Sequence, residues 1–278
     1  MNGFPQFAAA HGLRIDHLEE GRWVRVKTED KPSKKNGAYK FLGDIGFVQN
    51  HATMVDVAIW RNEESETVDR EAFARRMREL RAADRKVEAE RHAKASKEAS
   101  ALIAKCVSRP HAYLAKKGFP NAVGLVNWAG DLIIPMRDLA DYGVVNSLQR
   151  IREDGSKAFL PGGKAKGSVF VLGKGAWQER WLVEGYATGL SVYAALSDLR
   201  RPAEVVICFS AGNLRHVAAQ VKRPAFVMAD NDASGTGQEA AGATGLPWGM
   251  PEAPGTDAND LHASKGLRAL VGLVGGIR

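Results

Sequence analysis

In residues 181–186 (WLVEGY) and 226–232 (FVMADND), an apolar run is followed by one glutamate in the first stretch and by two aspartates in the second. An apolar run that leads into acidic and glycine-containing turn residues is typical of a buried strand. The carboxyl ends of parallel strands gather at one edge of an open α/β sheet, and ligands bind at that edge. We therefore expect Glu184, Asp230 and Asp232 to meet there.

The sequence around these two runs alternates between extended and helical patterns. Strands are predicted at 181–183, 203–209 and 225–229, and helices at 189–199, 214–221 and 238–243. Strands that alternate with amphipathic helices form parallel βαβ units. The predicted fold class of this part of the chain is therefore α/β, with a parallel sheet flanked by helices.

The three carboxylates have the chemistry of a divalent-metal site. Asp230 and Asp232 are two residues apart, so on an extended segment they point the same way and can share Mg²⁺ or Mn²⁺. Glu184 is expected to be either a further ligand or the general acid or base. In a third acidic cluster, Asp260 is favoured over Asp257 as a ligand, although the spacing leaves both open. Any one of these acids alone would more often be a helix cap or turn residue, and only their combination favours a metal.

A glycine-rich basic segment precedes the first of these strands. Residues 152–167 combine Asp-Gly and Gly-Gly turns with Lys157, Lys164 and Lys166. Backbone N–H groups and ammonium ions in such a loop can approach phosphate oxygens closely. The spacing of a P-loop does not occur, and a plain surface connection is the alternative. The formal net charge of +7 agrees with a polyanionic partner.

Two further segments come before this region. Short apolar runs between turn residues predict several strands within 1–60, a module made basic by Arg22, Arg25, Lys27, Lys34, Lys35 and Lys40. A stretch without Pro or Gly, from about Thr67 to the stop at Arg109-Pro110, predicts a long helix that is largely a solvated arm. Both segments are either nucleic-acid contacts or ordinary solvated surfaces. The aromatic residues Trp23, Tyr39 and Phe41 are correspondingly either stacking platforms for bases or core.

The composition is that of an ordinary soluble protein, with 45% hydrophobic and 26% charged residues. Cys106 and Cys208 form no Cys-x-x-Cys pair, and seven scattered histidines do not replace one, so no zinc ribbon is expected. The N-terminus lacks a signal-peptide pattern, and no segment approaches the roughly 18 apolar residues of a membrane span. We therefore expect a cytoplasmic protein that has no membrane partner.

The acidic motifs, in this order and spacing, resemble the Toprim domain of primases, topoisomerases and some nucleases. The resemblance extends to the stand-alone primases of phages and plasmids and covers nearly the whole chain, with motifs at 11–13, 37–39, 111–118, 134–138, 148–157 and 211–214. It implies that a basic subdomain holds template and nucleotides through Gln149, Arg150, Lys157, Lys164 and Lys166, and that Gly212 and Asn213 line the site. Two features depart from the bacterial primases. Thr188 replaces an aspartate, and the N-terminal zinc ribbon is missing.

The resemblance and the residues together predict a DNA-dependent primase that synthesises short RNA primers with Mg²⁺ or Mn²⁺ and without zinc. The expected partners are a single-stranded DNA template, ribonucleoside triphosphates and a separate replicative helicase, in a bacterial cell and with a phage or plasmid origin. The predicted architecture is a small β-rich basic module (1–62), a long charged helix or linker (63–108), a mixed α+β basic subdomain (109–178) and a Toprim catalytic domain (179–278).

Two alternatives remain open. A metal-dependent Toprim nuclease would use the same acids to direct water, and it would not require the basic segment 149–166 for nucleotide selection. A non-catalytic DNA-binding replication accessory would tolerate the loss of Glu184.

Overall fold

The computed structural model describes residues 3–54, 56–62, 70–173 and 175–277 of the chain. The chain divides into two compact units, Met1–Ala82 and Ala83–Arg278. Each unit has its own sheet and its own hydrophobic core. The four-segment division at residues 62, 108 and 178 stays a prediction.

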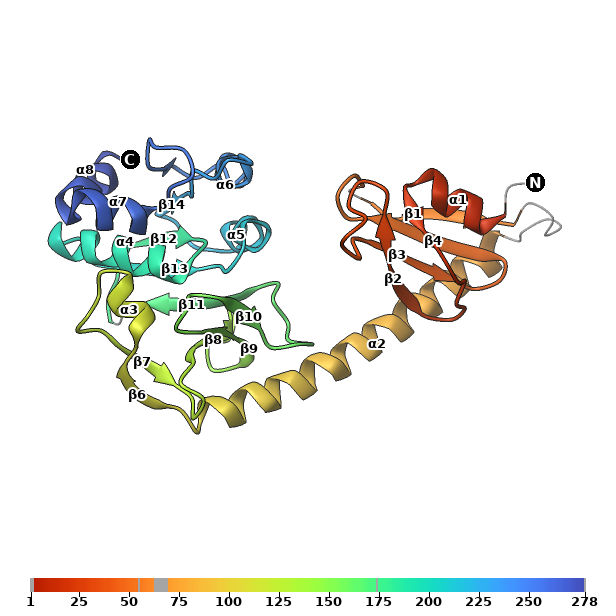
Figure 1. Cartoon of the computed structure of the whole chain (residues 1–278), viewed down its shortest axis with the longest axis horizontal. Helices are drawn as coiled ribbons and strands as arrows, with labels where there is room; N and C mark the ends of the chain where they lie inside the picture. The colour runs from red at the N-terminus through yellow and green to blue at the C-terminus, as the bar shows by residue number, and fades with distance from the viewer. Residues whose placement is uncertain (1–2, 55, 63–69, 174, 278) are drawn as a thin grey trace. The chain divides into compact units, whose positions relative to one another are not determined.

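The first unit is a five-stranded antiparallel sheet with one short helix packed on it (Figure 1). Its elements are α1 (Phe4–Ala10), β1 (Leu13–Arg14), β2 (Trp23–Thr28), β3 (Gly37–Phe41), β4 (Ile45–Asn50) and β5 (Ala58–Arg61). The strands neighbour one another in sequence order, as short connections between antiparallel strands dictate. They lie in the segment for which short strands are predicted. The pattern did not predict α1, which has Pro5 in its first turn and then an alanine run, both favourable to a helix.

The larger hydrophobic cluster of the first unit lies on one face of this sheet, and a smaller one, in which Ile45 and Phe47 meet Met77, lies on the other face. Phe4 of α1 stacks on Phe41, with 4.9 Å between ring centroids, and Tyr39 is fully buried beside them. The Tyr39 hydroxyl donates a hydrogen bond to the His17 carbonyl at 3.0 Å, which satisfies the buried phenol. The interpretation of Tyr39 as a stacking platform for bases is therefore wrong, because Tyr39 is core, and Phe41 is half-buried against the same cluster. Trp23 differs from them, since 42% of its surface is exposed.

The long helix α2 (Arg70–Ile103) has the solvated middle that the sequence predicts. Val87 in this middle part is 66% exposed. Near its C-terminal end, Ala95 and Ala99 are buried against residues of the second unit's sheet, including Ile133 and Leu148. The predicted start of the helix near residue 67 lies outside the described residues.

The predicted end of this helix at Pro110 is wrong. The helix ends at Ile103, and Pro110 is the last residue of strand β6 (Val107–Pro110). β6 pairs with one neighbour, β7 (Val123–Val126). An edge strand tolerates proline, because a missing N–H on its outer side breaks no ladder hydrogen bond.

The second unit is built on a mixed sheet in the order β10-β9-β8-β11-β13-β12-β14-β15, to which β7 and β6 add beside β8. Its further strands are β8 (Leu132–Asp138), β9 (Val145–Ile151), β10 (Lys157–Phe159), β11 (Ser168–Leu172), β12 (Glu179–Val183), β13 (Ala203–Ile207), β14 (Ala225–Met228) and β15 (Trp248–Gly249). Strands β8 to β10 are antiparallel, whereas β12 to β15 run parallel. Strand β11 is antiparallel to both β8 and β13 and so joins the two parts. The predicted α/β class is confirmed.

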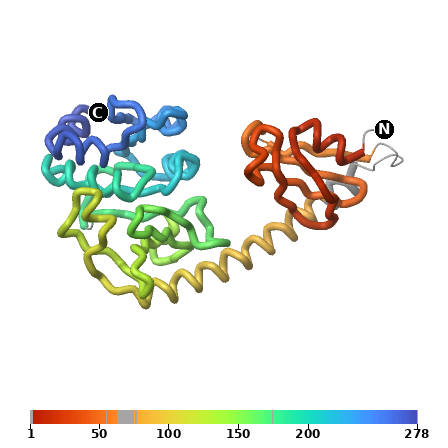
Figure 2. The backbone as a smooth tube through the Cα atoms, in the orientation of Figure 1, coloured from red at the N-terminus to blue at the C-terminus, as the bar shows by residue number. Residues whose placement is uncertain are grey.

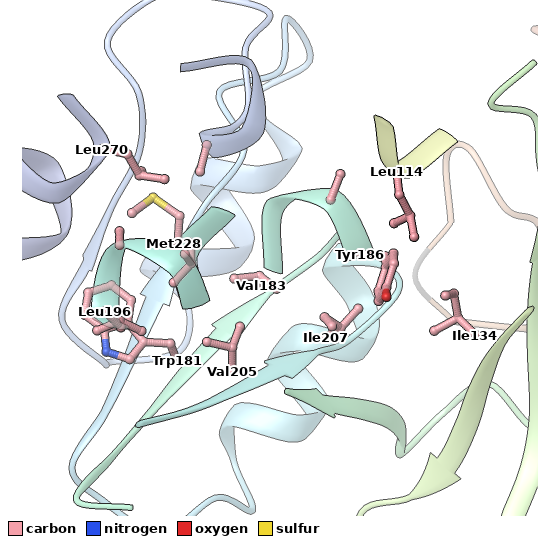
Figure 3. Packing of buried hydrophobic residues seen from close by; sticks show 14 of the residues in the cluster. Leu114, Ile134, Trp181, Val183, Tyr186, Leu196, Val205, Ile207, Met228 and Leu270 are labelled. Atoms are coloured by element: carbon pink, nitrogen blue, oxygen red, sulfur yellow. The ribbon is translucent and has the colours of Figure 1, made fainter. Parts of the chain in front are cut away.

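Helices cover both faces of the parallel strands. They are α4 (Tyr186–Asp198), α5 (Ala211–Ala218), α6 (Thr236–Gly242), α7 (Ala258–Lys265) and α8 (Leu267–Gly276), and a short helix, α3 (Ala112–Lys116), precedes β7. Figure 2 traces this path from the yellow-green strands to the blue C-terminal helices. On one face Trp181 and Val183 pack with Leu196 of α4 and Leu270 of α8 (Figure 3). On the other face Leu182 packs in a second cluster that includes residues of α5 and α6.

Because the parallel strands β12 to β14 are buried on both faces of the sheet, their sequences are continuous apolar runs.

Among the described residues, none of the helices combines the length and apolar character needed to cross a bilayer.

Candidate active site

A cavity of about 190 Å³ lies at the carboxyl ends of β12, β13 and β14, the edge at which the sequence predicts a ligand. It is lined by Tyr113, Lys117, Gln149, Lys157, Glu184, Gly185, Ala187, Thr188, Phe209, Asp230 and Asp257. The lining thus combines carboxylates from three elements with two lysines. A larger cavity of about 310 Å³ lies at the opposite ends of β12 and β13, where the one lining carboxylate, Glu204, is paired with Arg180.

Asp230 is a carboxylate of the cavity whose pKa is strongly raised. It follows β14, and burial together with the charges of Asp257, Glu184 and Asp232 raises its pKa to about 7, while Lys157 opposes the rise. Its Oδ1 atom is buried and has no hydrogen-bond partner among the described residues. Because a buried oxygen without a partner is costly, Asp230 is placed to accept a cation or a donor from a ligand.

Glu184 lies at the end of β12 and faces the same cavity. Burial raises its pKa, the charge of Asp232 adds to the rise, and Lys157 and the backbone N–H of Ala211 oppose it. The Glu184 carbonyl accepts the N–H of Phe209 at 2.8 Å, which ties the ends of β12 and β13 together. Phe209 has a φ of 67°, a left-handed conformation that costs a residue other than glycine about 1–3 kcal/mol. Such strain is concentrated at functional sites, in agreement with the position of Phe209 in the cavity wall.

Asp232 is outside the cavity lining and organises the turn into α6. Its Oδ1 accepts the backbone N–H of Ser234 at 2.9 Å, and its Oδ2 accepts that of Gly237 at 3.0 Å. These hydrogen bonds, with one from the Ser234 hydroxyl, lower the pKa of Asp232. The Asp232 charge still raises the pKa of Glu184 and Asp230. The fold therefore brings the three carboxylates into one electrostatic cluster but directs the Asp232 oxygens toward backbone.

Gly237 allows the first turn of α6 to approach Asp230 closely. A Cβ at Gly237 would lie 2.3 Å from the Asp230 carbonyl oxygen, whereas one at Gly242 of the same helix would meet no neighbouring atom within 4 Å. We expect Gly237→Ala to lower the free energy of unfolding by about 1–3 kcal/mol, because backbone must move. Gly242→Ala should instead raise it by up to about 1 kcal/mol. Urea unfolding of both variants checks this, and equal stabilities would contradict the close approach.

Asp257 and Asp260 form the capping box of α7. Asp257 Oδ1 accepts the N–H of Asp260 at 2.9 Å, and Asp260 Oδ2 accepts the N–H of Asp257 at 3.2 Å. The Thr188 hydroxyl donates to Asp257 Oδ2 at 3.2 Å. Asp257 lines the cavity and raises the pKa of Asp230, whereas Asp260 is outside the lining and lies 3.7 Å from Lys117 Nζ. This geometry favours Asp257 as the further ligand, the reverse of the preference drawn from the sequence.

The donor chemistry of the cavity suits a hard divalent cation. Glu184, Asp230 and Asp257 offer carboxylate oxygens, and one Asp230 oxygen is buried without a partner. Within the part of the chain that the structure describes, no three His, Cys, Asp or Glu side chains already stand close enough together to hold one ion. Mg²⁺ does not need such a cage, because one or two carboxylates commonly hold it together with waters and substrate phosphates. The residues therefore fit Mg²⁺ or Mn²⁺ shared with a phosphate ligand, and the metal itself stays a prediction.

Two of the predicted nucleotide- and template-binding residues, Gln149 and Lys157, line the cavity. They lie on the hairpin of β9 and β10, in which Gln149 is opposite Phe159 and Lys157 is opposite Ile151. Lys157 Nζ lies 5.9 Å from the centre of the Tyr113 ring. A lysine at this place is positioned to meet a phosphate that is held against the carboxylates.

The other predicted basic residues are outside the cavity lining. Arg150 follows Gln149 on β9 and so points to the opposite face, where its guanidinium lies 3.4 Å from the Asp131 carboxylate. Lys164 lies 2.8 Å from Asp138 and holds the pKa of that carboxyl well below its usual range. Lys166 is exposed. A role of these three in template binding stays a prediction.

Gly212 and Asn213 are also outside the lining, in the first turn of α5. Asn213 is buried, and its Nδ2 donates to the carbonyls of Ser168 and Cys208, each at 2.8 Å. Its Oδ1 accepts the N–H of Gly167 at 2.7 Å. The observed contacts of Asn213 thus fasten the start of β11 to the end of β13.

The sequence did not assign Tyr113 and Lys117 to the site, although both line the cavity. The Tyr113 hydroxyl is buried and has no partner among the described residues. Burial and the charge of Asp257 raise its pKa to about 12, so the hydroxyl keeps its proton at neutral pH. His111 caps α3 by accepting the Tyr113 N–H at 3.1 Å. Both residues belong to the sequence motif at 111–118, but this motif lies far in sequence from the acidic strands.

No family model matches the chain. The chain is 28% identical over 239 residues to DNA primase TraC from Escherichia coli, an alignment that covers 77% of this chain and 21% of that protein. The chain therefore spans about a fifth of the length of this relative. The sequence resemblance to DNA primases is confirmed at this level.

Solved structures with a similar chain path also come from primases. The primase fragment of the bacteriophage T7 primase-helicase protein is 19% identical, covers 52% of this chain and 62% of its own, and has a TM-score of 0.38. The DnaG catalytic core is 16% identical, with coverage of 53% and 52% and a TM-score of 0.37. The RNA polymerase domain of Mycobacterium tuberculosis primase DnaG is 16% identical, with coverage of 70% and 73% and a TM-score of 0.36.

Proposed function

We propose that the chain is a DNA primase, which joins ribonucleoside triphosphates into short RNA primers on single-stranded DNA. The observation that carries this proposal is the cavity in which Glu184, Asp230 and Asp257 face Lys117 and Lys157. Nucleotidyl transfer needs carboxylates that hold divalent cations and positive groups that bind phosphates. The sequence relationship to DNA primase TraC supports the same assignment.

We also propose that residues 179–278 have the Toprim architecture. Strand β12 is hydrogen-bonded in parallel to both β13 and β14, so the residues that follow β12 and β14 emerge side by side. This topology brings Glu184 next to Asp230, which agrees with the order of acids in the Toprim motifs.

In the proposed reaction, the 3′-hydroxyl oxygen of one nucleotide forms a bond to the α-phosphorus of the next, and the bond to pyrophosphate breaks. Glu184 accepts the hydroxyl proton, a role that suits a carboxylate whose pKa is raised by burial. Asp230 and Asp257 would hold Mg²⁺ or Mn²⁺, which when bound neutralises the phosphate oxygens. Lys157 attracts the triphosphate to the same place. A separate replicative helicase is the proposed protein partner.

Primer synthesis on mixed-sequence single-stranded DNA tests the function. The full chain, labelled ribonucleotides and a titration of Mg²⁺ and Mn²⁺ should give short RNA products that require the template. The same template, labelled at its 5′ end, should stay intact. Template cleavage without RNA synthesis would replace the primase proposal with the nuclease alternative.

Tyr113→Phe should reduce primer synthesis about tenfold to hundredfold by raising the KM for nucleotides. The reason is that a protonated hydroxyl without a partner in the cavity is free to donate to a phosphate or ribose oxygen, and one hydrogen bond to a charged group contributes about 1.5–3 kcal/mol. Stability should not fall, because the variant removes an unsatisfied buried group. Tyr193→Phe, at a tyrosine outside this cavity, is the control. A Tyr113→Phe protein that is less stable but equally active would assign the hydroxyl to folding.

A further inference from the structure

A row of cations crosses the exposed face of β1 and β2 in the first unit. Trp23, Arg25 and Lys27 are exposed at alternate positions of β2, while the two valines between them pack against the core on the other face. Arg14 of β1 is exposed and is directly opposite Lys27 in the antiparallel register, so both side chains share one face. We call Arg14, Trp23, Arg25 and Lys27 the β1–β2 patch.

The three cations of the patch are not neutralised within the described residues. Arg14, Arg25 and Lys27 form no ion pair there, in contrast to the nearby Arg22, which pairs with Glu19. Like charges directly opposite each other destabilise a sheet by about 0.2–1 kcal/mol. The row of cations therefore lowers the stability of the fold, and a bound polyanion would offset that loss.

Trp23 gives the patch a second kind of contact. Its ring lies 6.2 Å from the ring of Phe47 on β4, which supports it from across β3, and 42% of its surface remains exposed. A half-exposed aromatic ring that is held from one side is a suitable platform for a base. Bases are available for such stacking in single strands but not inside a duplex.

We propose that the β1–β2 patch binds single-stranded nucleic acid, with phosphates on Arg14, Arg25 and Lys27 and a base stacked on Trp23. This site is separate from the catalytic cavity of the second unit and needs neither metal nor nucleotide. The positive charge and the exposed ring together select this ligand over an acidic protein, which would satisfy the charges but leave the ring without a stacked base.

Binding of a fluorescent oligothymidylate to the full chain, in chelator and without nucleotides, tests the proposal. The triple variant Arg14→Ala, Arg25→Ala, Lys27→Ala should bind at least about tenfold more weakly. Its log–log salt slope should be reduced by about 2, since each lost phosphate contact accounts for roughly 0.7 on a single strand. The control loses the same charge at exposed lysines of the second unit, through Lys97→Ala, Lys105→Ala and Lys222→Ala, and should keep the wild-type slope.

Trp23 distinguishes a nucleic-acid surface from a merely basic one. Trp23→Ala should lose about fivefold to hundredfold in affinity, the range for one base stacked on an aromatic side chain, while Trp23→Phe keeps most of it. The measurement contains neither metal nor nucleotide, so it remains informative even if the chain makes no primers. The proposal is overturned if the patch triple variant and the control triple variant have equal affinity and slope, or if Trp23→Ala binds as wild type does.

Discussion

Asp230→Asn should reduce primer synthesis by at least about a hundredfold and leave the protein folded. The change removes the carboxylate whose pKa is raised to about 7 by burial and by its acidic neighbours, and whose Oδ1 has no partner among the described residues. The loss of one group that stabilises charge in the transition state typically costs about 10²–10³-fold in rate. Synthesis should stay low across a full titration of Mg²⁺ and Mn²⁺, because added metal cannot replace the lost ligand. Asp198→Asn, at an exposed acid at the end of α4, is the matched control and should be active.

Asp230→Asn should also be more stable than the wild-type protein in chelator at pH 8. The folded-state pKa of Asp230 is about 7, above the ordinary value of 3.8, so the folded protein binds more protons between these pH values. Wild-type stability therefore falls as pH rises from about 4 to about 7, and the Asp230→Asn variant avoids this fall because its amide carries no charge. Urea unfolding from pH 4 to pH 8 measures the difference, which should grow with pH. A difference that is independent of pH would show that the fold does not raise the pKa of Asp230.

Some of this fold follows from local sequence. The alternating pattern of 181–243 predicts the parallel strands because each strand is buried on both faces and is therefore apolar throughout. The pattern does not predict the pairing of β11 with both β8 and β13, since sheet order depends on contacts between distant segments. The sequence predicts a loop where the short strand β10 lies, because its three residues lie among glycines and lysines and a periodicity cannot be detected over so short a segment.

Part of the candidate site could also be predicted from the sequence. Glu184 and Asp230 could be found because each follows an apolar strand, and carboxyl ends of neighbouring parallel strands must meet. The choice between Asp257 and Asp260 could not be made, because it depends on which side chain the capping box of α7 turns toward the cavity. Tyr113 could not be placed for a different reason, since α3 reaches the cavity only through the packing of the antiparallel part of the sheet against α4 and α7.

Lys157→Ala should lower primer synthesis by about tenfold to hundredfold without weakening the binding of Mn²⁺. Lys157 lowers the pKa of both Glu184 and Asp230, so its ammonium group is a positive charge that competes with a metal for the same carboxylates. Its removal takes a competing cation away from the carboxylates, so metal affinity should be equal or higher at a pH at which they are ionised. Nucleotide binding should suffer, because the ammonium group supplies a point charge to a phosphate. Calorimetric titration with Mn²⁺ and steady-state kinetics with labelled nucleotides measure the two effects separately.

Two further variants sharpen this prediction. Lys157→Arg keeps the charge and should restore part of the activity, whereas Lys105→Ala removes an exposed lysine outside the cavity and should have no effect. The opposite responses of Mn²⁺ affinity, weaker in Asp230→Asn and unchanged or stronger in Lys157→Ala, separate a metal ligand from a phosphate-binding cation. Loss of both Mn²⁺ affinity and synthesis in Lys157→Ala would mean that the lysine positions the carboxylates rather than binding phosphate. Unchanged synthesis would exclude Lys157 from the reaction, and the nucleotide would then have to rely on Lys117, the other lysine of the cavity.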